Sequence, residues 1–244
     1  MKLEFWHEDM IRFMTDASEY GDYYQQLTET MLPWLSGDMH ICDAGSGLGY
    51  LSLSLAPYVR QVTAVEKHPD AAAVLTENCR SRGIRNVISR CGSIDEVLPD
   101  EQYDAMVFCF FGGIRQTLEI AKRQCRKDVF VFTRNYKNHR FSAGSLPTGW
   151  DGYPEFRTLL EHLKIPFQQQ VLLPEFGQPF RNARDARRFY ELYSKDNDQS
   201  MITEEFLKTK LVETGSGDFP LYAPHQRQVA FLHFSVNDIP DEMG

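Results

Sequence analysis

Short apolar runs alternate with helical repeats through the middle of the chain. The runs that read as buried strands are "MHICDAG", "QVTAVE", "VISRCG", "YDAMVFCFF" and "DVFVFTR". Between the second and third of them, "HPDAAAVLTENCRSRG" has helical spacing, with Pro69 suited to a first turn and Gly83 to a C-terminal stop. Strands and helices in alternation predict a doubly wound, mostly parallel sheet.

The segment that follows the first strand allows two readings. Leu51, Leu53 and Leu55 alternate as in a strand, whereas Leu48, Leu51 and Leu55 share one face of a helix. Because parallel neighbouring strands need a crossover connection, we favour the helix.

Beyond Arg134 the alternation of strands and helices is less regular. A helix at "PEFRTLLEHLKI", a sixth strand at "FQQQVLLPEF" and a last strand at "VAFLHFSV" are expected, with helix-like segments "ARDARRFYELYS" and "TEEFLKTKLVE" between the last two strands. Long insertions in compact domains are usually functional or disordered. We therefore predict an α/β fold: a doubly wound, mostly parallel seven-stranded sheet with helices on both faces, an N-terminal helical lid (1–38), a core (39–175 and 226–237) and a helical insertion or cap (176–225).

Composition and charge narrow the function. The formal net charge of −8 argues against coating of long nucleic acid, whose affinity depends on basic side chains. Eight basic residues and two acids lie between Arg115 and Arg140, which is either a solvated helix face or a phosphate-binding track. The five cysteines form no C-x-x-C pair, and no signal peptide or long apolar run is evident. A cytoplasmic protein without a disulfide framework or zinc site is expected.

A glycine-rich turn follows the first strand. That strand ends at Asp43 and leads through Gly45, Gly47 and Gly49, which expose bare backbone and free N–H groups to a ligand. Glu66 lies 19 residues past Gly47, close to the interval expected for an acid that binds a ribose. The dinucleotide pattern G-x-G-x-x-G is absent, because its last position is Tyr50.

The spacing D-x-G-x-G-x-G resembles the first motif of class I S-adenosylmethionine-dependent methyltransferases, and the resemblance extends from about His40 to Arg134. It implies S-adenosylmethionine as cofactor and S-adenosylhomocysteine as product. Asp43 would face the methionine amino group, Glu66 the ribose, "CGSID" the adenine, and "DAMVFCFFGG" the methyl donor. The cofactor-binding residues implied are Asp43, Gly45, Ser46, Gly47, Gly49, Glu66, Lys67, Ser93, Ile94 and Phe108.

The methyl acceptor is less constrained. The N/D-P-P-Y/F motif of enzymes that methylate nucleobase amines or glutamine amides is absent after the fourth strand. We expect in-line methyl transfer to a small, possibly anionic metabolite, without a metal. No catalytic residue is assigned, although His7, Tyr136 and His139 are candidates for a proton acceptor and each also suits an ordinary surface role.

Acceptor-binding candidates come from two groups. Tyr20 and Tyr24 belong to an aromatic N-terminal segment that is either a lid or a plain packing helix. Arg115, Arg134 and Arg181 suit a carboxylate or phosphate, or else pair with N-terminal acids. Two other functions stay open, namely an RNA methyltransferase that uses residues 115–140 and a non-catalytic cofactor-binding protein. Neither nucleic acid nor a membrane is the expected partner, and the chain is expected to be a monomer or a homodimer.

Overall fold

The centre of the molecule is a seven-stranded sheet, seen in the computed structural model, which describes residues 6–136, 141–144 and 152–242. The strand order is β3-β2-β1-β4-β5-β10-β6. Pairing is parallel except for β10, which is antiparallel to both β5 and β6. The strands are β1 His40–Ala44, β2 Gln61–Glu66, β3 Val87–Cys91, β4 Tyr103–Cys109, β5 Cys125–Arg134, β6 Gln168–Leu172 and β10 Val229–Ser235. The predicted mostly parallel, seven-stranded sheet is confirmed.

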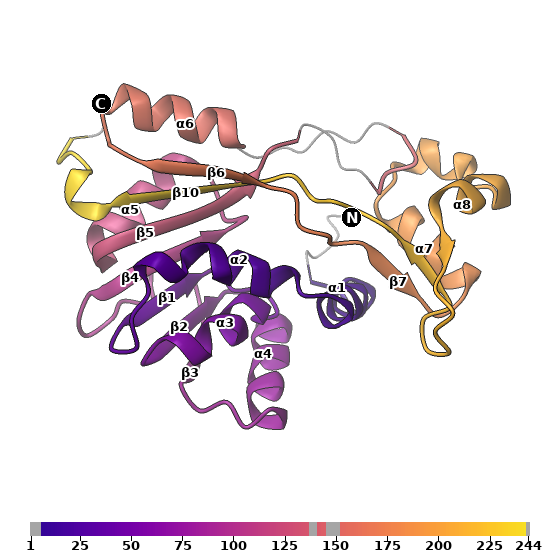
Figure 1. Cartoon of the computed structure of the whole chain (residues 1–244), viewed down its shortest axis with the longest axis horizontal. Coiled ribbons are helices and arrows are strands. Elements are labelled where there is room, and N and C mark those ends of the chain that lie inside the picture. Colours follow the sequence, from indigo (N-terminus) through magenta and orange to yellow (C-terminus); the bar gives the residue numbers. More distant parts are fainter. Residues whose placement is uncertain (1–5, 137–140, 145–151, 243–244) are drawn as a thin grey trace.

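Helices cover both faces of this sheet (Figure 1). One apolar layer includes Leu27, Leu51 and Leu75, and the other includes Leu118 and Leu160. The first face carries α2 (Tyr23–Met31), α3 (Tyr50–Leu55) and α4 (Pro69–Ser81), and the second carries α5 (Ile114–Gln124) and α6 (Tyr153–His162). The helical reading of residues 50–55 is confirmed. In the described ranges, no helix is both long and apolar enough to cross a membrane.

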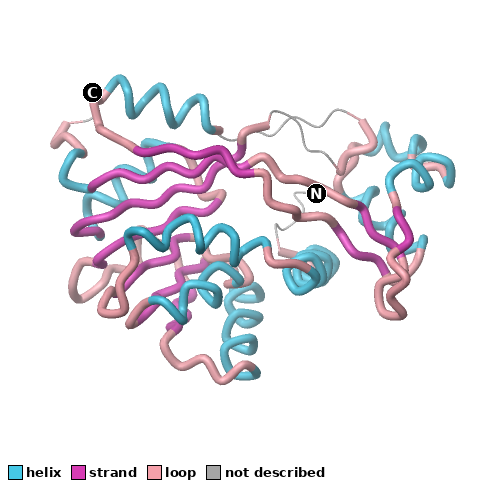
Figure 2. Tube along the Cα trace, in the orientation of Figure 1, coloured by secondary structure: helices cyan, strands magenta, loops and turns pink. Residues whose placement is uncertain are grey.

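The insertion between β6 and β10 forms a separate lobe, the cap (Figure 2). It contains α7 (Ala183–Leu192), a 3-10 turn (Asp196–Met201) and α8 (Glu204–Lys210), as the helix-like segments predicted. It also contains an antiparallel sheet in the order β7-β9-β8, from Gln178–Phe180, Leu221–Ala223 and Val212–Glu213. The sequence did not predict these strands, because strands of two or three residues are too short for their alternation to be read.

The N-terminal segment divides between the two lobes. Helix α1 (Glu8–Tyr20) packs Phe13 against Phe180 and Phe189 of the cap, with ring centroids 6.2 and 5.1 Å apart. After a break at Gly21, α2 packs Leu27 into the apolar layer of the large sheet. Helix α1 thus lies beside the cap and α2 over the core (Figure 1).

Two extended segments join the core to the cap, and we name residues 173–177 and 224–228 the connecting ribbon. Phe176 N donates to His225 O at 2.6 Å, and Arg227 N donates to Pro174 O at 2.8 Å. Glu175 and Gln226 form an antiparallel bridge between these two hydrogen bonds. The cap is therefore held by paired backbone rather than by two independent loops.

Candidate functional site

The glycine turn between β1 and α3 has a backbone that only glycine adopts readily. The φ angles of Gly45, Gly47 and Gly49 are +72°, +55° and +80°. A Cβ at Gly49 would lie 2.2 Å from Leu75 Cδ1. Gly45 N donates to Val65 O at 2.9 Å, which ties the turn to the end of β2. The sequence therefore builds a rigid stretch of bare backbone at the carboxyl edge of the sheet.

Glu66 ends β2 beside this turn. Its Oε2 accepts from Gly47 N at 2.9 Å and its Oε1 accepts from His68 N at 2.9 Å. The residue is 6% exposed. Each carboxylate oxygen has a second lone pair, so both can still accept a hydrogen bond from a vicinal diol. These residues fit the ribose of a nucleoside.

Asp43 is buried at the end of β1, with 1% of its surface exposed. Its Oδ2 accepts from Ser52 Oγ at 2.5 Å, whereas its Oδ1 has no hydrogen-bond partner among the described residues. Burial raises the pKa of Asp43 to about 6, against the hydrogen bond from Ser52, and the charge of Glu66 raises it further. An ammonium group would satisfy the orphaned oxygen, as the amino end of S-adenosylmethionine requires.

Two aromatic rings rest on the glycine backbone. A Cβ at Gly45 would lie 2.6 Å from Phe111 Cδ2, and one at Gly47 would lie 3.0 Å from Trp6 Cζ2. Phe111 follows β4 and Trp6 precedes α1. The aromatic side chains of Phe111 and Trp6 therefore already cover the bare backbone of the glycine turn.

The remaining residues predicted for the cofactor lie in different surroundings. Ile94 and Phe108 are buried in the apolar layer beneath α5, and the Phe108 ring lies 5.4 Å from that of Phe111. Ser93 Oγ accepts from Asp95 N at 3.4 Å, Lys67 is exposed, and Ser46 Oγ has no hydrogen-bond partner within the described ranges. At the end of β4, Phe111 rather than Phe108 reaches the glycine turn.

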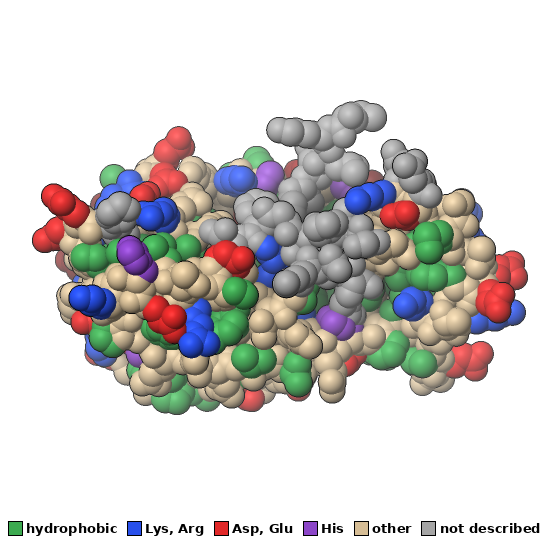
Figure 3. All heavy atoms as spheres, turned by 90° about the horizontal axis from the view of Figure 1, so that it is seen from above, with side chains coloured by type: hydrophobic (Ala, Val, Ile, Leu, Met, Phe, Trp, Pro, Cys, Tyr) green, Lys and Arg blue, Asp and Glu red, His purple; other side chains and the backbone are tan. Residues whose placement is uncertain are grey.

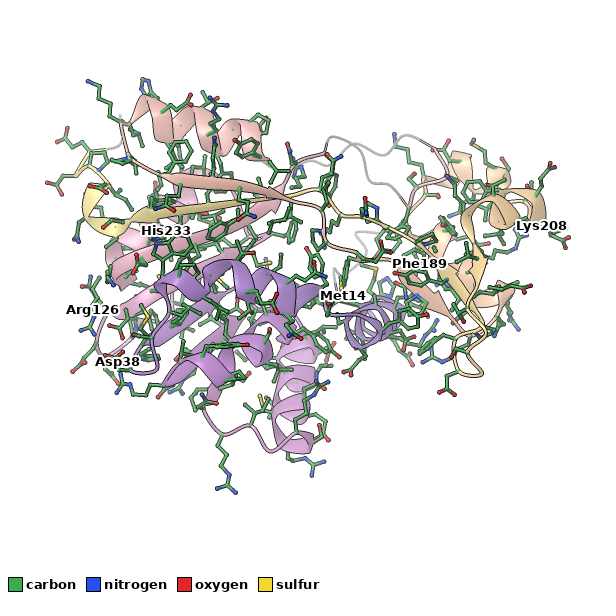
Figure 4. The ribbon with its side chains drawn as sticks, in the orientation of Figure 1. Met14, Asp38, Arg126, Phe189, Lys208 and His233 are labelled. Carbon is green, nitrogen blue, oxygen red and sulfur yellow. The ribbon has the colours of Figure 1, made fainter. Side chains whose placement is uncertain are left out.

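A pocket opens where α1, the cap and the connecting ribbon meet. Its walls are mainly apolar and aromatic, with a few polar groups between them. Met14 of α1 and Phe189 of the cap both line it, and Figure 4 labels these two residues. The other lining residues include Phe176, Gln178, Tyr193, Tyr136, His225 and Arg227. Such a mixture is typical of small-molecule sites.

The three proton-acceptor candidates are placed differently. Tyr136 lines the pocket, and its Oη accepts from Arg227 Nη2 at 3.4 Å. His7 is the N-cap residue of α1, without a side-chain capping bond. His139 lies outside the described residues. Of the two that the structure describes, Tyr136 lines the pocket and His7 does not.

The residues predicted to bind the acceptor also lie in different places. Tyr24 lies near the site, with its ring centroid 6.0 Å from that of Phe176, and Tyr20 stacks on Tyr222 of the cap at 5.0 Å. Arg181 forms a two-bond ion pair with Asp16 of α1, one of those bonds being 2.8 Å. The structure thus contains the ion pair that the sequence offered as the alternative, and a role of Arg181 at an acceptor stays a prediction.

The other two arginine candidates lie on different elements. Arg134 is half-buried at the end of β5, and Arg115 is exposed in the first turn of α5. Their role at an acceptor stays a prediction.

The basic residues of α5 and early β5 are largely paired with acids. Lys122 contacts Asp241 at 2.8 Å, Arg123 pairs with Asp95 at 2.5 Å, and Arg126 pairs with Asp104. Arg126 lies at the end of the sheet away from the pocket (Figure 4). On the face seen in Figure 3, acidic and basic side chains are interspersed. These pairs leave few cations of this stretch available for a phosphate backbone.

Sequence reasoning missed Arg227 and its neighbour Phe176, whereas the neighbouring Phe110 lies in the segment "DAMVFCFFGG" and Tyr23 in the aromatic N-terminal segment. The position of Arg227 before the last strand could have indicated a place at the site. The last strand is antiparallel, so it begins at the edge where the parallel strands end, and Arg227 lies just before it. Phe110 has φ +52°, a strained value for a residue with a side chain, and such strain clusters at functional sites.

No group of three potential metal ligands occurs in the part of the chain that the structure describes. Independence from metals stays a prediction.

Comparison with known proteins identifies the core. A family model described as a methyltransferase domain matches residues 41–132. A 23S rRNA uracil-C(5)-methyltransferase of Chromohalobacter salexigens is 30% identical over 82 residues, which is 33% of this chain and 17% of that protein. The chain covers less than a fifth of the length of each such curated relative.

Solved structures share the fold. A SAM-dependent methyltransferase from Aquifex aeolicus superimposes with a TM-score of 0.55 at 18% identity, over 69% of this chain and 93% of that one. A precorrin-8w decarboxylase from Methanobacterium thermoautotrophicum gives 0.52 at 17% identity, over 86% and 88%. These structures show that the chain shares their fold, and the family model described as a methyltransferase domain covers the glycine turn and the central strands of the core.

Proposed function

We propose that this protein transfers a methyl group from S-adenosylmethionine to a small-molecule acceptor bound between α1 and the cap. The observation that carries the proposal is a juxtaposition at one edge of the sheet. The orphaned Asp43 Oδ1 and the Glu66 carboxylate suit the cofactor. The aromatic pocket, whose lining includes Tyr136 just after β5 and Arg227 just before β10, suits an acceptor.

The cofactor supplies a methyl group that is already activated on a sulfonium. The protein's part is therefore mainly positioning, and well-oriented groups reach effective molarities of about 10⁵ M or more. In this proposal Glu66 accepts from the ribose hydroxyls, Asp43 accepts from the amino group, and the pocket walls exclude water.

A proton acceptor is needed only if the nucleophile of the acceptor is protonated. Tyr136 is the candidate that lines the pocket. Cys109 lies at the end of β4, but burial raises the pKa of its thiol, and the charge of Asp43 raises it further. The thiol stays protonated, so Cys109 does not serve as a base.

Calorimetric titration with S-adenosylmethionine and S-adenosylhomocysteine tests the cofactor assignment. We expect micromolar binding by the wild type, at least tenfold weaker binding by Glu66→Ala, and loss of binding by Gly47→Arg, which places a long side chain on the bare backbone. Glu77→Ala is the matched control, because Glu77 is an exposed acid of α4 paired with Arg80. Undiminished binding by Gly47→Arg would remove the assignment.

An RNA acceptor is the second candidate, favoured by the names of the curated relatives. The net charge and the acid partners of Lys122, Arg123 and Arg126 weigh against it. An RNA acceptor would require affinity that falls steeply between 50 and 200 mM salt. Electrophoretic mobility shifts with a structured RNA over that range distinguish the two acceptors.

A further inference from the structure

Arg227 belongs to the connecting ribbon and lines the pocket. Strand β10 is antiparallel to β5, and Val229 at its start pairs with Arg134 at the end of β5. Residues just before Val229 therefore lie beside the end of β5, at the same edge of the sheet at which β1 and β4 end. The connecting ribbon holds Arg227 there through the bond from its N–H to Pro174 O.

The guanidinium of Arg227 is surrounded by aromatic rings. Its Cζ lies 3.8 Å from the ring centroid of Phe110, 5.5 Å from that of Phe176 and 5.7 Å from that of Tyr23. A guanidinium stacked at 3.8 Å has its orientation fixed by the ring, and its N–H donors point along the edge of its plane.

This cation lacks an acid. Among the described residues, Arg227 forms no ion pair with a carboxylate, and its side chain donates one hydrogen bond, to Tyr136 Oη at 3.4 Å. By contrast, Arg12, Arg181 and Arg188 at the interface of α1 and the cap all pair with aspartates. A guanidinium has five donors, and withdrawing one from water without a counter-charge is costly.

A second polar group beside it is also unsatisfied. Tyr23 is 1% exposed, and its Oη has no hydrogen-bond partner in the described part of the chain. Burial raises the pKa of Tyr23, while the charge of Arg227 opposes that shift, so the phenol is neutral and able to donate. A stacked cation and a buried donor together suit an oxyanion.

The pocket beyond Arg227 defines the rest of the ligand. Met14, Phe176, Phe189 and Tyr193 form walls that favour a flat apolar body over a sugar or a polyamine. We propose that Arg227 binds a carboxylate carried by an aromatic or similarly flat apolar methyl acceptor, whose body lies between α1 and the cap. This inference rests on the proposed methyl transfer, for which it names the class of acceptor.

The test measures binding of benzoate and of its neutral analogue benzamide, with and without saturating S-adenosylhomocysteine. We expect wild-type protein to prefer benzoate at least tenfold. The preference should disappear in Arg227→Gln, which keeps a planar donor without the charge, and return in part in Arg227→Lys. Arg85→Met is the matched control, because it removes an exposed positive charge elsewhere on the core.

Three outcomes would overturn the inference: equal binding of benzoate and benzamide by the wild type, no measurable benzoate binding, or unchanged preference in Arg227→Gln. A fourth is weaker S-adenosylhomocysteine binding in Arg227→Gln with unchanged 5′-methylthioadenosine binding, which would assign Arg227 to the carboxylate of the cofactor. The proposed function fails separately, through absent S-adenosylhomocysteine binding by the wild type. Thermal unfolding of each variant verifies that it is folded.

Discussion

At the scale of single residues, Asp43 couples burial to cofactor chemistry. Its raised pKa means that the folded protein holds a proton more tightly than the unfolded chain does. Without cofactor, the contribution of Asp43 to stability is fully present below pH 4 and is lost as the pH rises through about 6. An ammonium group at Oδ1 would reverse this preference, because it favours the ionised carboxylate.

We therefore predict that the affinity for S-adenosylhomocysteine is highest above pH 6 and falls as the pH drops through about 6, by up to about tenfold per pH unit. Calorimetric titrations between pH 5 and pH 7.5 measure it. Asp43→Asn, which cannot ionise, should bind weakly and without this pH dependence. A wild-type affinity that does not change with pH would mean that Asp43 does not bind the amino group of the cofactor.

The residues that the sequence revealed are those whose roles depend on local spacing. Gly45, Gly47, Gly49 and Glu66 lie within one strand-helix-strand unit, so a short motif carries their geometry. Arg227 lies 184 residues beyond Asp43, and only the antiparallel pairing of β10 brings it to the same edge. A list of charged residues could not distinguish it from Arg181, whose partner Asp16 lies 165 residues away in sequence.

At the scale of elements, reciprocal ion pairs join α1 to α7. Arg12 of α1 makes two bonds to Asp185, at 3.0 and 2.8 Å, and Arg188 of α7 contacts Asp9 at 3.0 Å. Two acids of the N-terminal segment, Asp9 and Asp16, thus pair with two arginines of the insertion, Arg188 and Arg181. The sequence offered this pairing as one of two readings, because charge alone does not identify a partner.

A double-mutant cycle on Arg12 and Asp185 should give a coupling free energy of about 1 kcal/mol, since Arg12 is 34% and Asp185 16% exposed and the geometry is bidentate. Thermal or denaturant unfolding at low and high salt provides the four stabilities. The exposed pair Arg157 and Glu161 of α6 serves as the reference, with an expected coupling of about 0.3–0.5 kcal/mol. Equal coupling in the two cycles would mean that the contacts between α1 and α7 add nothing beyond a surface pair.

At the scale of the whole molecule, two lobes share the N-terminal segment. Phe13 belongs to the apolar cluster of the cap, whereas Leu27 belongs to that of the core. The alternating pattern of the chain predicted the core correctly, because each strand and helix there is long enough to show its period. It did not predict that α1 joins the cap, which depends on contacts between residues far apart in sequence.

Phe13→Ala should therefore destabilise the packing of α1 on the cap more than the packing of the core. Truncating a buried phenylalanine costs about 3–5 kcal/mol, and we expect faster hydrogen exchange in α1 and α7 with little change in β1 and β4. Leu27→Ala, in contrast, should accelerate exchange in the elements that pack on the large sheet. Hydrogen-exchange mass spectrometry resolves these segments. A uniform acceleration in Phe13→Ala would show that the lobes unfold as one unit.

The connecting ribbon has a consequence for how this protein tolerates changes in length over evolution. Successive side chains of an extended segment point to opposite sides, so one residue gained or lost between Pro224 and Val229 would turn Arg227 away from Phe110. Residues gained in the exposed turn between β8 and β9 would leave that register intact. Related chains can therefore acquire caps of very different size while keeping the distance from Arg227 to the last strand constant.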